Sequence, residues 1–417
     1  MIQAKPFEIP KQVVWEAYKR IKQNQGAAGV DEVSIQDFER NLKDNLYKLW
    51  NRMSSGSYFP PAVRRVEIPK KDGGLRPLGI PTVSDRIAQM VVKTYLEPKV
   101  EPHFHRDSYG YRPGKSAHQA LDAAKVRCWR RDWVLDVDIK GFFDNLDHAL
   151  LMKAVEKHAD SKWIGLYIRR WLRAPVQDKD KVLHSTERGT PQGGVISPLL
   201  ANLFLHYAFD KWMMTHHVST PFERYADDIL VHCRTEEEAK VFQEVIKDRL
   251  EQCKLALHPE KTKIVYCKDS NRQGNYPYES FDFLGYTFRP RGVKNQEGKF
   301  FVSFTPAISN QSARLIRRTV RSWRLHRRSG SRLEALARQI NPVLRGWINY
   351  YGHCQRSQLY DVFHTLNQRL IKWAMKKYKH LYGHKSRAAH WLGWMAKQNP
   401  DLFAHWQIIR PPARWAT

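Results

Sequence analysis

The sequence predicts an α+β fold in which helices pack on a mostly antiparallel sheet, followed by a helical and strongly basic C-terminal part. Short apolar, β-branched runs at 133–139 and 229–231 predict strands of that sheet. Apolar stripes at helical spacing lie between these runs. From about Ser309 onward the pattern is helical and basic, with no long linker. Strands and helices segregated in this way are typical of an α+β architecture.

The N-terminal elements come first. Residues 1–60 predict helices, and one apolar helical stripe includes Val14 and Ile21. Residues 63–81 follow a strand–turn–strand pattern, whose turn is Lys-Asp-Gly-Gly at 71–74.

The middle of the chain predicts the sheet and its covering helices. The strand at 133–139 reaches Asp138, and a β-hairpin is predicted at 222–231. Two helix starts are marked by Ser197 followed by Pro198, and by the capping-box pair Thr235 and Glu238.

Charge is the second large feature of the chain. The net charge is +28, and residues 289–417 hold 25 Lys and Arg against four acids. Such a load repels itself, so extended nucleic acid is the expected partner. A basic membrane-binding helix is the alternative, but no run approaches 18 apolar residues. Because no signal-peptide pattern is visible either, we expect a cytoplasmic protein without a membrane partner.

Length and composition narrow the class further. A chain of 417 residues is long enough for two or three domains with sizeable cores. The hydrophobic share of 42% excludes a disordered chain. The five cysteines are widely spaced and form no Cys-x-x-Cys pair, so the spacing predicts neither a disulfide framework nor a structural zinc site.

Adjacent carboxylates at Asp227 and Asp228 are the most informative local feature. They follow Tyr225-Ala226 and precede an apolar strand, so they are predicted to lie in a hairpin turn. Asp138 is predicted to end another strand of the same sheet. Carboxylates this close resist joint ionisation unless a cation neutralises them, and hard oxygen ligands suit Mg²⁺. A surface Asp-Asp turn is the alternative interpretation.

Three sequence motifs carry a resemblance to a known family. Three segments resemble the catalytic motifs of group II intron-type reverse transcriptases, in the family's order: Asp138-Ile139-Lys140-Gly141-Phe142-Phe143-Asp144, the run from Gly189 to Asn202 that begins Gly-Thr-Pro-Gln-Gly-Gly, and Tyr225-Ala226-Asp227-Asp228. Further matches lie at 26–31, 68–81, 109–114, 259–263, 283–286 and 346–351. The resemblance covers about residues 20–375.

The resemblance implies a right-hand polymerase fold. It divides the chain into an N-terminal extension with fingers (1–85), a fingers and palm core (86–290), an α-helical thumb or maturase domain X (291–375), and a short basic tail (376–417). This Trp-rich tail is a candidate for DNA binding. No endonuclease domain with paired cysteines is seen, so the endonuclease-less form is expected.

The resemblance also implies roles for site residues. Asp138, Asp227 and Asp228 would hold two Mg²⁺ ions and serve as the catalytic carboxylates. Asp136 and Asp144 are expected to be bystanders, with Asp144 capping the next helix. Candidate contacts to the incoming nucleotide are Lys70, Arg76, Phe143, Gln192 and Lys261.

Each nucleotide-contact candidate has a specific rationale. Lys70 and Arg76 would offset triphosphate charge, with solvated hairpin cations as the alternative. The Phe143 ring would exclude a 2′-hydroxyl, with a core phenylalanine as the alternative. Gln192 precedes two glycines that permit close backbone approach. Lys261 is a candidate proton donor to pyrophosphate.

Arginines dominate the candidate RNA-binding surface. Seven of them, whose spacing suggests several faces of a helix, lie between 314 and 328: Arg314, Arg317, Arg318, Arg321, Arg324, Arg327 and Arg328. Arg112 is expected to be a template or structural contact. The tryptophans at 373, 391, 394 and 406 are more often core than base-stacking residues.

The predicted function is that of an RNA-directed DNA polymerase encoded by a group II intron, which also acts as a maturase. Expected partners are group II intron RNA, template RNA, primer or target DNA, and dNTPs. A splicing-only maturase is one alternative, although it would not need three metal-binding carboxylates. A domesticated relative in phage defence is another, separable only by genomic context. The sequence leaves the oligomeric state open.

Overall fold

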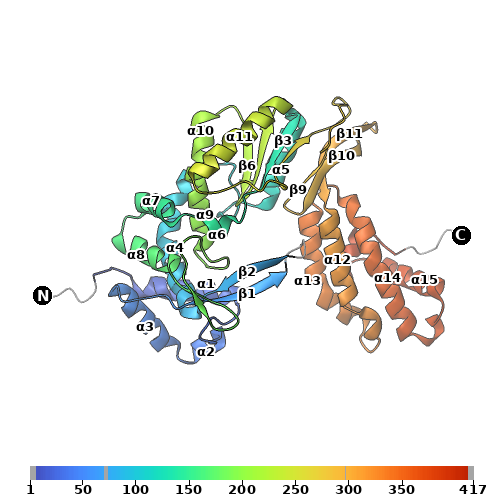
Figure 1. The fold of residues 1–417 in the computed structure, drawn as a ribbon. Helices are drawn as coiled ribbons and strands as arrows, with labels where there is room; N and C mark the ends of the chain where they lie inside the picture. The colour runs from blue at the N-terminus through green and yellow to red at the C-terminus, as the bar shows by residue number, and fades with distance from the viewer. Residues whose placement is uncertain (1–5, 70–73, 296, 412–417) are drawn as a thin grey trace. The chain divides into compact units, whose positions relative to one another are not determined.

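The computed structural model describes residues 6–69, 74–295 and 297–411. The chain divides into two compact units. Unit 1 consists of residues 1–120 and 133–264, and unit 2 of residues 121–132 and 265–417. The mixture of helices and sheets agrees with the predicted α+β class (Figure 1).

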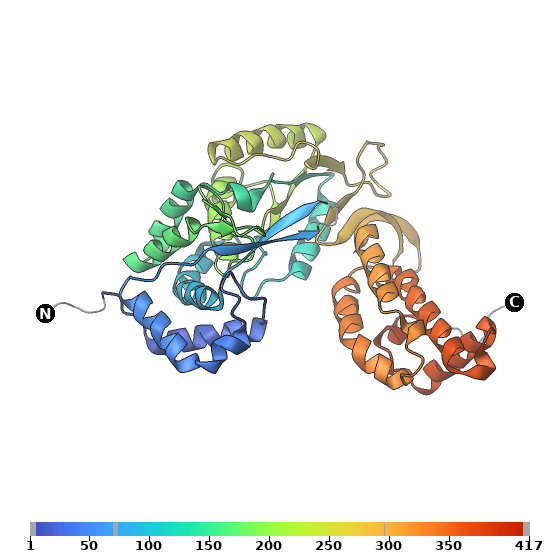
Figure 2. The same ribbon diagram turned by 60° about the horizontal axis from the view of Figure 1, so that its bottom comes forward.

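Unit 1 begins with helices, as predicted. These are α1 (Lys11–Asn24), α2 (Ile35–Arg40) and α3 (Leu42–Ser54). Val14 and Ile21 of the predicted stripe are buried on α1, which packs on α3 and α4 (Val83–Val100). Figure 2 shows these helices gathered at the N-terminal end of the ribbon.

A small sheet follows, in the strand order β2-β1-β4-β5. Its strands are β1 (Val63–Pro69), β2 (Leu75–Ile80), β4 (Val176–Gln177) and β5 (Leu183–His184). Antiparallel pairing of β1 with β2 confirms the predicted strand–turn–strand pattern, whose turn falls partly outside the described residues. The β1–β4 pair is parallel.

The central sheet has the order β6-β7-β3-β8. Its strands are β3 (Trp133–Val137), β6 (Phe222–Tyr225), β7 (Asp228–Cys233) and β8 (Lys263–Tyr266). Strand β7 pairs antiparallel with both β3 and β6. Except for half-buried Asp136, every residue of β3 is buried, and so is β7 after Asp228, because helices cover the sheet.

The helices of this region follow the predicted starts. Helix α9 begins at Ser197, and the side chain of Thr235 caps α11 by accepting from the Glu238 N–H. Helix α11 packs on β3 and β7. The helices between η1 (Glu101–His103) and β8 are α5 (Ala117–Arg130), α6 (Phe142–Asn145), α7 (His148–His158), α8 (Lys162–Leu172), α9 (Ser197–Leu205), the π-helical η2 (His206–Asp210), α10 (Lys211–His216) and α11 (Glu236–Gln252).

Unit 2 combines a three-stranded antiparallel sheet with a helical bundle. The sheet order is β11-β10-β9, formed by β9 (Phe281–Phe283), β10 (Tyr286–Lys294) and β11 (Phe300–Ile308). The helices after it are α12 (Asn310–Ser322), η3 (Leu325–Arg327), α13 (Leu333–Tyr351), η4 (Arg356–Leu359), α14 (Tyr360–Lys377), η5 (Lys379–Leu381), α15 (Lys385–Gln398) and η6 (Ala404–Gln407).

One hydrophobic core runs through this bundle, from Ile308 to Trp406. Trp373 and Trp406 are fully buried in it and Trp391 packs against it, which confirms the core interpretation for these three tryptophans. Trp394, by contrast, is 55% exposed. The described part of the expected tail at 376–417 therefore shares the core of the helices before it.

Candidate active site

The carboxylate pair lies at a two-residue β-turn. Tyr225 of β6 pairs with Asp228 of β7, so Ala226 and Asp227 alone form the turn. Ala226 has a φ of 58°, the left-handed conformation that such a tight hairpin requires. Asp227 is therefore at the tip of the turn, whereas Asp228 already opens β7 and is exposed.

Asp138 comes to the same edge of the sheet. Val137 at the end of β3 pairs with Ile229 of β7 in an antiparallel arrangement. Asp138 follows Val137 and Asp228 precedes Ile229, so both aspartates lie beyond this pair at the same edge of the sheet. The Asp138 backbone carbonyl accepts hydrogen bonds from the His258 N–H at 2.8 Å and the Thr262 hydroxyl at 3.4 Å. The structure thus brings the three predicted carboxylates together.

The pKa of Asp227 reflects the proximity of Asp138. Burial raises the pKa of the Asp227 carboxyl, the charge of Asp138 raises it further, and the charges of Arg76 and Arg224 oppose the shift. The Tyr111 pKa is also raised, by burial first and then by the charge of Asp227. The residues present therefore leave negative charge at this edge incompletely neutralised, which fits a divalent cation held by carboxylate oxygens.

Two of the nucleotide-contact candidates, Arg76 and Lys261, lie near this edge. Arg76 is exposed on β2, and its charge reaches Asp227. Lys70 is outside the described residues. Lys261 is exposed in the turn whose neighbours, His258 and Thr262, bond the Asp138 backbone.

Phe142 and Phe143 have different environments. Phe142 is only 2% exposed, whereas Phe143 is half-buried, and the two ring centroids are 5.3 Å apart in an edge-to-face arrangement. The Phe143 carbonyl accepts from the Thr190 N–H at 2.8 Å, which links α6 to the glycine-rich loop. Phe142 is thus the core ring, and Phe143 is only partly buried.

Gln192 lies in that loop, which approaches β2. Its carbonyl accepts from the Gly79 N–H at 2.7 Å. Gly193 has a φ of 116°, and a Cβ there would lie 2.5 Å from the Gly79 carbonyl oxygen, so glycine is required. The close backbone approach predicted for this loop is made, in this structure, to strand β2.

One bystander behaves differently from its prediction. Asp144 is inside the short helix α6, whose N-cap is Gly141, and it caps no helix. The cap of the next helix, α7, is Asp147, whose carboxylate accepts from the Leu150 N–H at 2.9 Å. The chain makes an extra short helix before α7, so the capping position moves three residues downstream.

A buried ion pair behind the turn was not found from sequence. The Arg224 guanidinium donates to both carboxylate oxygens of Asp210, at 2.7 and 2.6 Å, and both side chains are fully buried. Its remaining nitrogen donates to the Asn202 side-chain oxygen at 2.9 Å and to the Ala226 carbonyl at 3.0 Å. Arg224 thereby connects the turn that carries Asp227 to the helical segment before β6.

The segment that contains Tyr109 and Gly110 also supports the turn that carries Asp227. The Asn202 amide donates to the Gly110 carbonyl at 2.6 Å, and the Tyr109 N–H donates to the Arg224 carbonyl at 2.7 Å. A Cβ at Gly110 would lie 2.4 Å from the Ala226 nitrogen, so this glycine lets the segment pass close behind the turn. Gly110 and Asn202 lie in motifs identified by resemblance, but only the fold shows that they meet.

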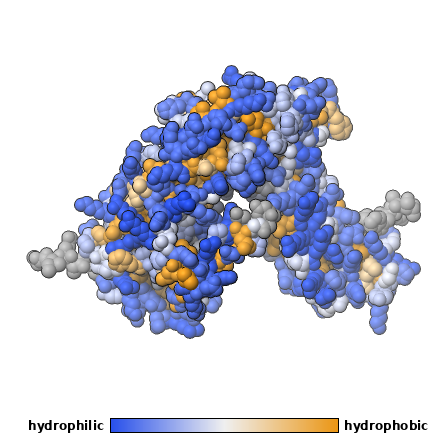
Figure 3. All heavy atoms as spheres, in the orientation of Figure 1, coloured by the Kyte–Doolittle hydropathy of each residue, from blue (hydrophilic) through white to orange (hydrophobic). Residues whose placement is uncertain are grey.

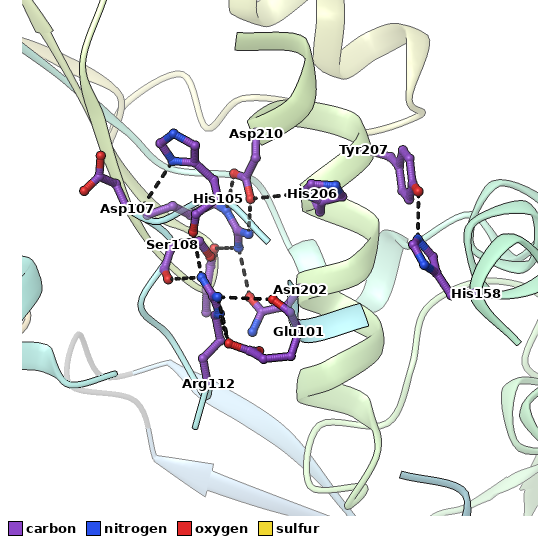
Figure 4. Close-up of polar contacts among 12 residues, drawn as sticks. Glu101, His105, Asp107, Ser108, Arg112, His158, Asn202, His206, Tyr207 and Asp210 are labelled. Atoms are coloured by element: carbon purple, nitrogen blue, oxygen red, sulfur yellow. Dashed lines mark hydrogen bonds and ion pairs between the residues drawn. The ribbon is translucent and has the colours of Figure 1, made fainter. Parts of the chain in front are cut away.

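Arg112 is structural in this arrangement. Its guanidinium donates to the Glu101 carboxylate at 2.9 and 2.7 Å, and to the carbonyls of His105 and Ser108 at 2.6 and 2.7 Å (Figure 4). The side chain is only 7% exposed. Of the two roles left open for Arg112, these contacts favour the structural one.

The arginines of unit 2 form one face rather than several. Helix α12 ends at Ser322, so of the seven arginines only Arg314, Arg317, Arg318 and Arg321 belong to it, and Arg324 follows in a left-handed conformation. At 3.6 residues per turn these four fall within a sector of about 100°. The opposite side buries Ala313, Ile316 and Val320. The expectation of several faces was wrong, because the helix is shorter than the arginine run.

Hydrophilic residues gather over the helices of unit 2 on the face drawn in Figure 3.

Among the helices in the described part of the chain, none is both long and apolar enough to cross a membrane.

Comparisons with known proteins bear on both units. Residues 68–288 match the family "Reverse transcriptase (RNA-dependent DNA polymerase)", and residues 313–391 match "Group II intron, maturase-specific domain".

Individual relatives are similar over parts of the chain. Protein YkfC of Escherichia coli (strain K12) is 34% identical over 279 residues, which cover 58% of this chain and 73% of that protein. Group II intron-encoded protein LtrA of Lactococcus lactis subsp. cremoris is 36% identical over 205 residues, covering 48% and 33%. Nuclear intron maturase 4, mitochondrial, of Arabidopsis thaliana is 25% identical over 167 residues, covering 40% and 21%. The matched part thus spans a third or less of the last two proteins.

Proposed function

The chain belongs to the reverse transcriptase (RNA-dependent DNA polymerase) family and carries the group II intron maturase-specific domain. On this premise we propose how its residues copy RNA into DNA and assist splicing. Unit 1 would supply the fingers and palm, and the helices of unit 2 the thumb. The observation that carries the proposal is the convergence of Asp138, Asp227 and Asp228 at one sheet edge.

The three carboxylates would hold two Mg²⁺ ions. When bound, Mg²⁺ neutralises charge on the triphosphate and lowers the pKa of the primer 3′-hydroxyl. The chain itself contributes the positions of the ligands. The two-residue turn and the buried Arg224 fix Asp227, and the 256–262 segment fixes the Asp138 backbone. The raised pKa of Asp227 supports a cation at this place, because a cation favours the ionised carboxyl.

The incoming dNTP would lie between this edge and strand β2. Arg76, together with Lys70, would bind the triphosphate oxygens. Gln192 would contact the new base pair, and Lys261 would protonate the pyrophosphate. Phe143, half-buried beside the core ring of Phe142, would exclude the ribonucleotide 2′-hydroxyl by volume.

Intron RNA would bind the arginine face of α12. The four arginines of its exposed side and the neighbouring Arg324 can neutralise phosphates along one RNA strand. The match of residues 313–391 to the maturase-specific domain supports this surface for intron RNA. Primer or target DNA is a further partner, for which the segment at 376–417 remains a candidate.

Two other functions would share this fold. A splicing-only maturase would bind intron RNA without polymerising, and a domesticated relative in phage defence would polymerise without an intron. The complete carboxylate set disfavours the first. An intron RNA surrounding the reading frame would exclude the second.

Primer extension on an RNA template with Mg²⁺ tests the proposal. Asp138→Asn should abolish dNTP incorporation while intron RNA affinity stays near wild type, because the affinity comes from unit 2. Asp144→Asn is the matched control, since Asp144 is an exposed carboxylate of the same motif, and it should keep normal extension. Appreciable extension by Asp138→Asn would refute the metal-site assignment.

A further inference from the structure

A second group of metal-binding atoms lies in unit 2. Asp122 belongs to α5, and His353 and Cys354 follow the end of α13. One carboxylate oxygen, one imidazole nitrogen and the thiol sulfur lie within 4.8 Å of one another. His353 Nε2 is 3.0 Å from each carboxylate oxygen of Asp122. The group includes none of the three carboxylates of the proposed polymerase site.

The local backbone explains why two consecutive residues reach the same point. Helix α13 stops at Tyr351, and the Gly352 N–H closes the last turn on the Ile348 carbonyl at 2.8 Å. The chain then turns, with Gln355 in a left-handed conformation. The Cys354 side chain is buried, whereas the side chains of His353 and Asp122 are 32% and 48% exposed, so an ion can enter from the solvent side.

The donor set matches zinc. In a tetrahedral site, bonds of about 2.0–2.3 Å to nitrogen, oxygen and sulfur place the ligand atoms about 3.5 Å apart. The 3.0 Å separation between His353 and Asp122 is that of a hydrogen bond and would have to widen by about 0.5 Å, while the three ligand atoms already lie within 4.8 Å of one another. Thiolate and imidazole favour Zn²⁺ over Mg²⁺, which prefers oxygen ligands. We propose that Asp122, His353 and Cys354 bind one Zn²⁺ ion, with water in the fourth position.

The surroundings set the cost of binding. Burial raises the pKa of the Cys354 thiol, and the charge of Lys125 opposes that shift, so binding would release the thiol proton. The Lys125 ammonium is 3.8 Å from Asp122 and would have to yield its place to the ion. In return, the ion would fix the segment after α13 to α5. No disulfide among the five cysteines does this, because all five are free and buried.

Spacing alone does not indicate this site. Cys354 has no second cysteine near it in the sequence, and Asp122 is far from it along the chain. The ligands meet only because residues 121–130 of α5 and the end of α13 belong to the same compact unit.

Cobalt titration of the full-length protein tests the proposal. The protein is stripped with a chelator, desalted and titrated with Co²⁺, whose bond to a thiolate produces a charge-transfer absorption that carboxylates alone do not give. We expect this absorption to saturate at one equivalent and to disappear when Zn²⁺ is added. Cys354→Ser should abolish it, and His353→Gln and Asp122→Asn should each weaken binding by about tenfold or more.

Two further measurements keep the outcome decisive. Cys253→Ser, which removes another buried cysteine, should leave the cobalt spectrum unchanged. Circular dichroism should show that each variant is folded. If Cys354→Ser does not fold, the His353→Gln variant, whose substitution is at a solvent-exposed position, decides the test. Wild-type protein without the absorption, or His353→Gln and Asp122→Asn with unchanged affinity, would mean that His353 and Asp122 form only an ion pair. Primer extension with Mg²⁺ is independent of this result, so the polymerase proposal is tested separately.

Discussion

The Arg224 guanidinium holds the Asp210 carboxylate with two parallel hydrogen bonds of 2.7 and 2.6 Å, and neither side chain is exposed to solvent. The same guanidinium bonds the carbonyl of Ala226, the residue immediately before Asp227. A buried charge pair is costly to desolvate and stabilises little in itself, so a role in positioning the turn is the better explanation for it.

Arg224→Lys should therefore reduce polymerisation more than it reduces folding. Lysine keeps the positive charge but lacks the planar fork that bonds Asp210 and Ala226 together. We expect kcat to fall by about tenfold or more, and the Mg²⁺ concentration for half-maximal rate to rise, because a looser turn presents Asp227 less well. Arg249→Lys is the control, since Arg249 also bonds backbone carbonyls, those of Ala208 and Tyr207, away from the turn. Equal Mg²⁺ requirements in the two variants would contradict the positioning role.

Phe143→Ala should admit ribonucleotides. Loss of the ring removes the proposed clash with the 2′-hydroxyl and leaves the carboxylates unchanged. Selectivity for dNTP over rNTP, measured as a ratio of kcat/KM, should fall by about tenfold or more. Phe142→Leu alters the buried neighbour, so it should cost about 1 kcal/mol of stability without changing selectivity. Unchanged selectivity in Phe143→Ala would assign Phe143 to the core.

Asp227→Asn should stabilise the metal-free protein at neutral pH. A carboxyl whose folded pKa is raised binds its proton more tightly in the folded state, so the folded state loses stability as pH rises through that pKa. Asparagine removes this penalty and should raise the Tm measured in EDTA at pH 7, with the difference shrinking toward pH 4. Added Mg²⁺ should raise the Tm of the wild type more than that of the variant. A lower Tm for the variant in EDTA would show that Asp227 is not electrostatically strained.

Neutralising the α12 face should flatten the salt dependence of RNA binding. Each phosphate contact contributes about 0.7–0.9 to the slope of log affinity against log salt, because binding releases counterions. The triple change of Arg317, Arg318 and Arg321 to Gln should weaken intron RNA binding and lower that slope by about two. The same three residues changed to Lys should restore most of the slope, since lysine keeps the charge. Short primer extension on a simple template should persist in both. A Gln variant with an unaltered slope would place the RNA elsewhere.

The alternation and capping patterns along the chain were enough to predict several elements. The hairpin at 222–231, the strand ending before Asp138 and the cap at Thr235 all depend on local chemistry, in which each residue's propensity and its nearest neighbours decide the outcome. The split of the Asp-Asp pair, with Asp227 in the turn and Asp228 in β7, depended on strand register, which a single sequence specifies less sharply. The α12 arginines came to one face because the helix ends at Ser322.

By itself the sequence determined the carboxylates, the basic C-terminal third and the helices and strands that carry them, because these follow from residue type and short-range spacing. Only the tertiary structure decided which distant residues meet. The pairing of Arg224 with Asp210, the approach of Gly110 behind Ala226 and the burial of Trp406 in the bundle core join residues that no period or motif connects. Such contacts depend on how whole helices and strands pack, and packing minimises buried unpaired charge and empty volume over the entire unit rather than along the chain.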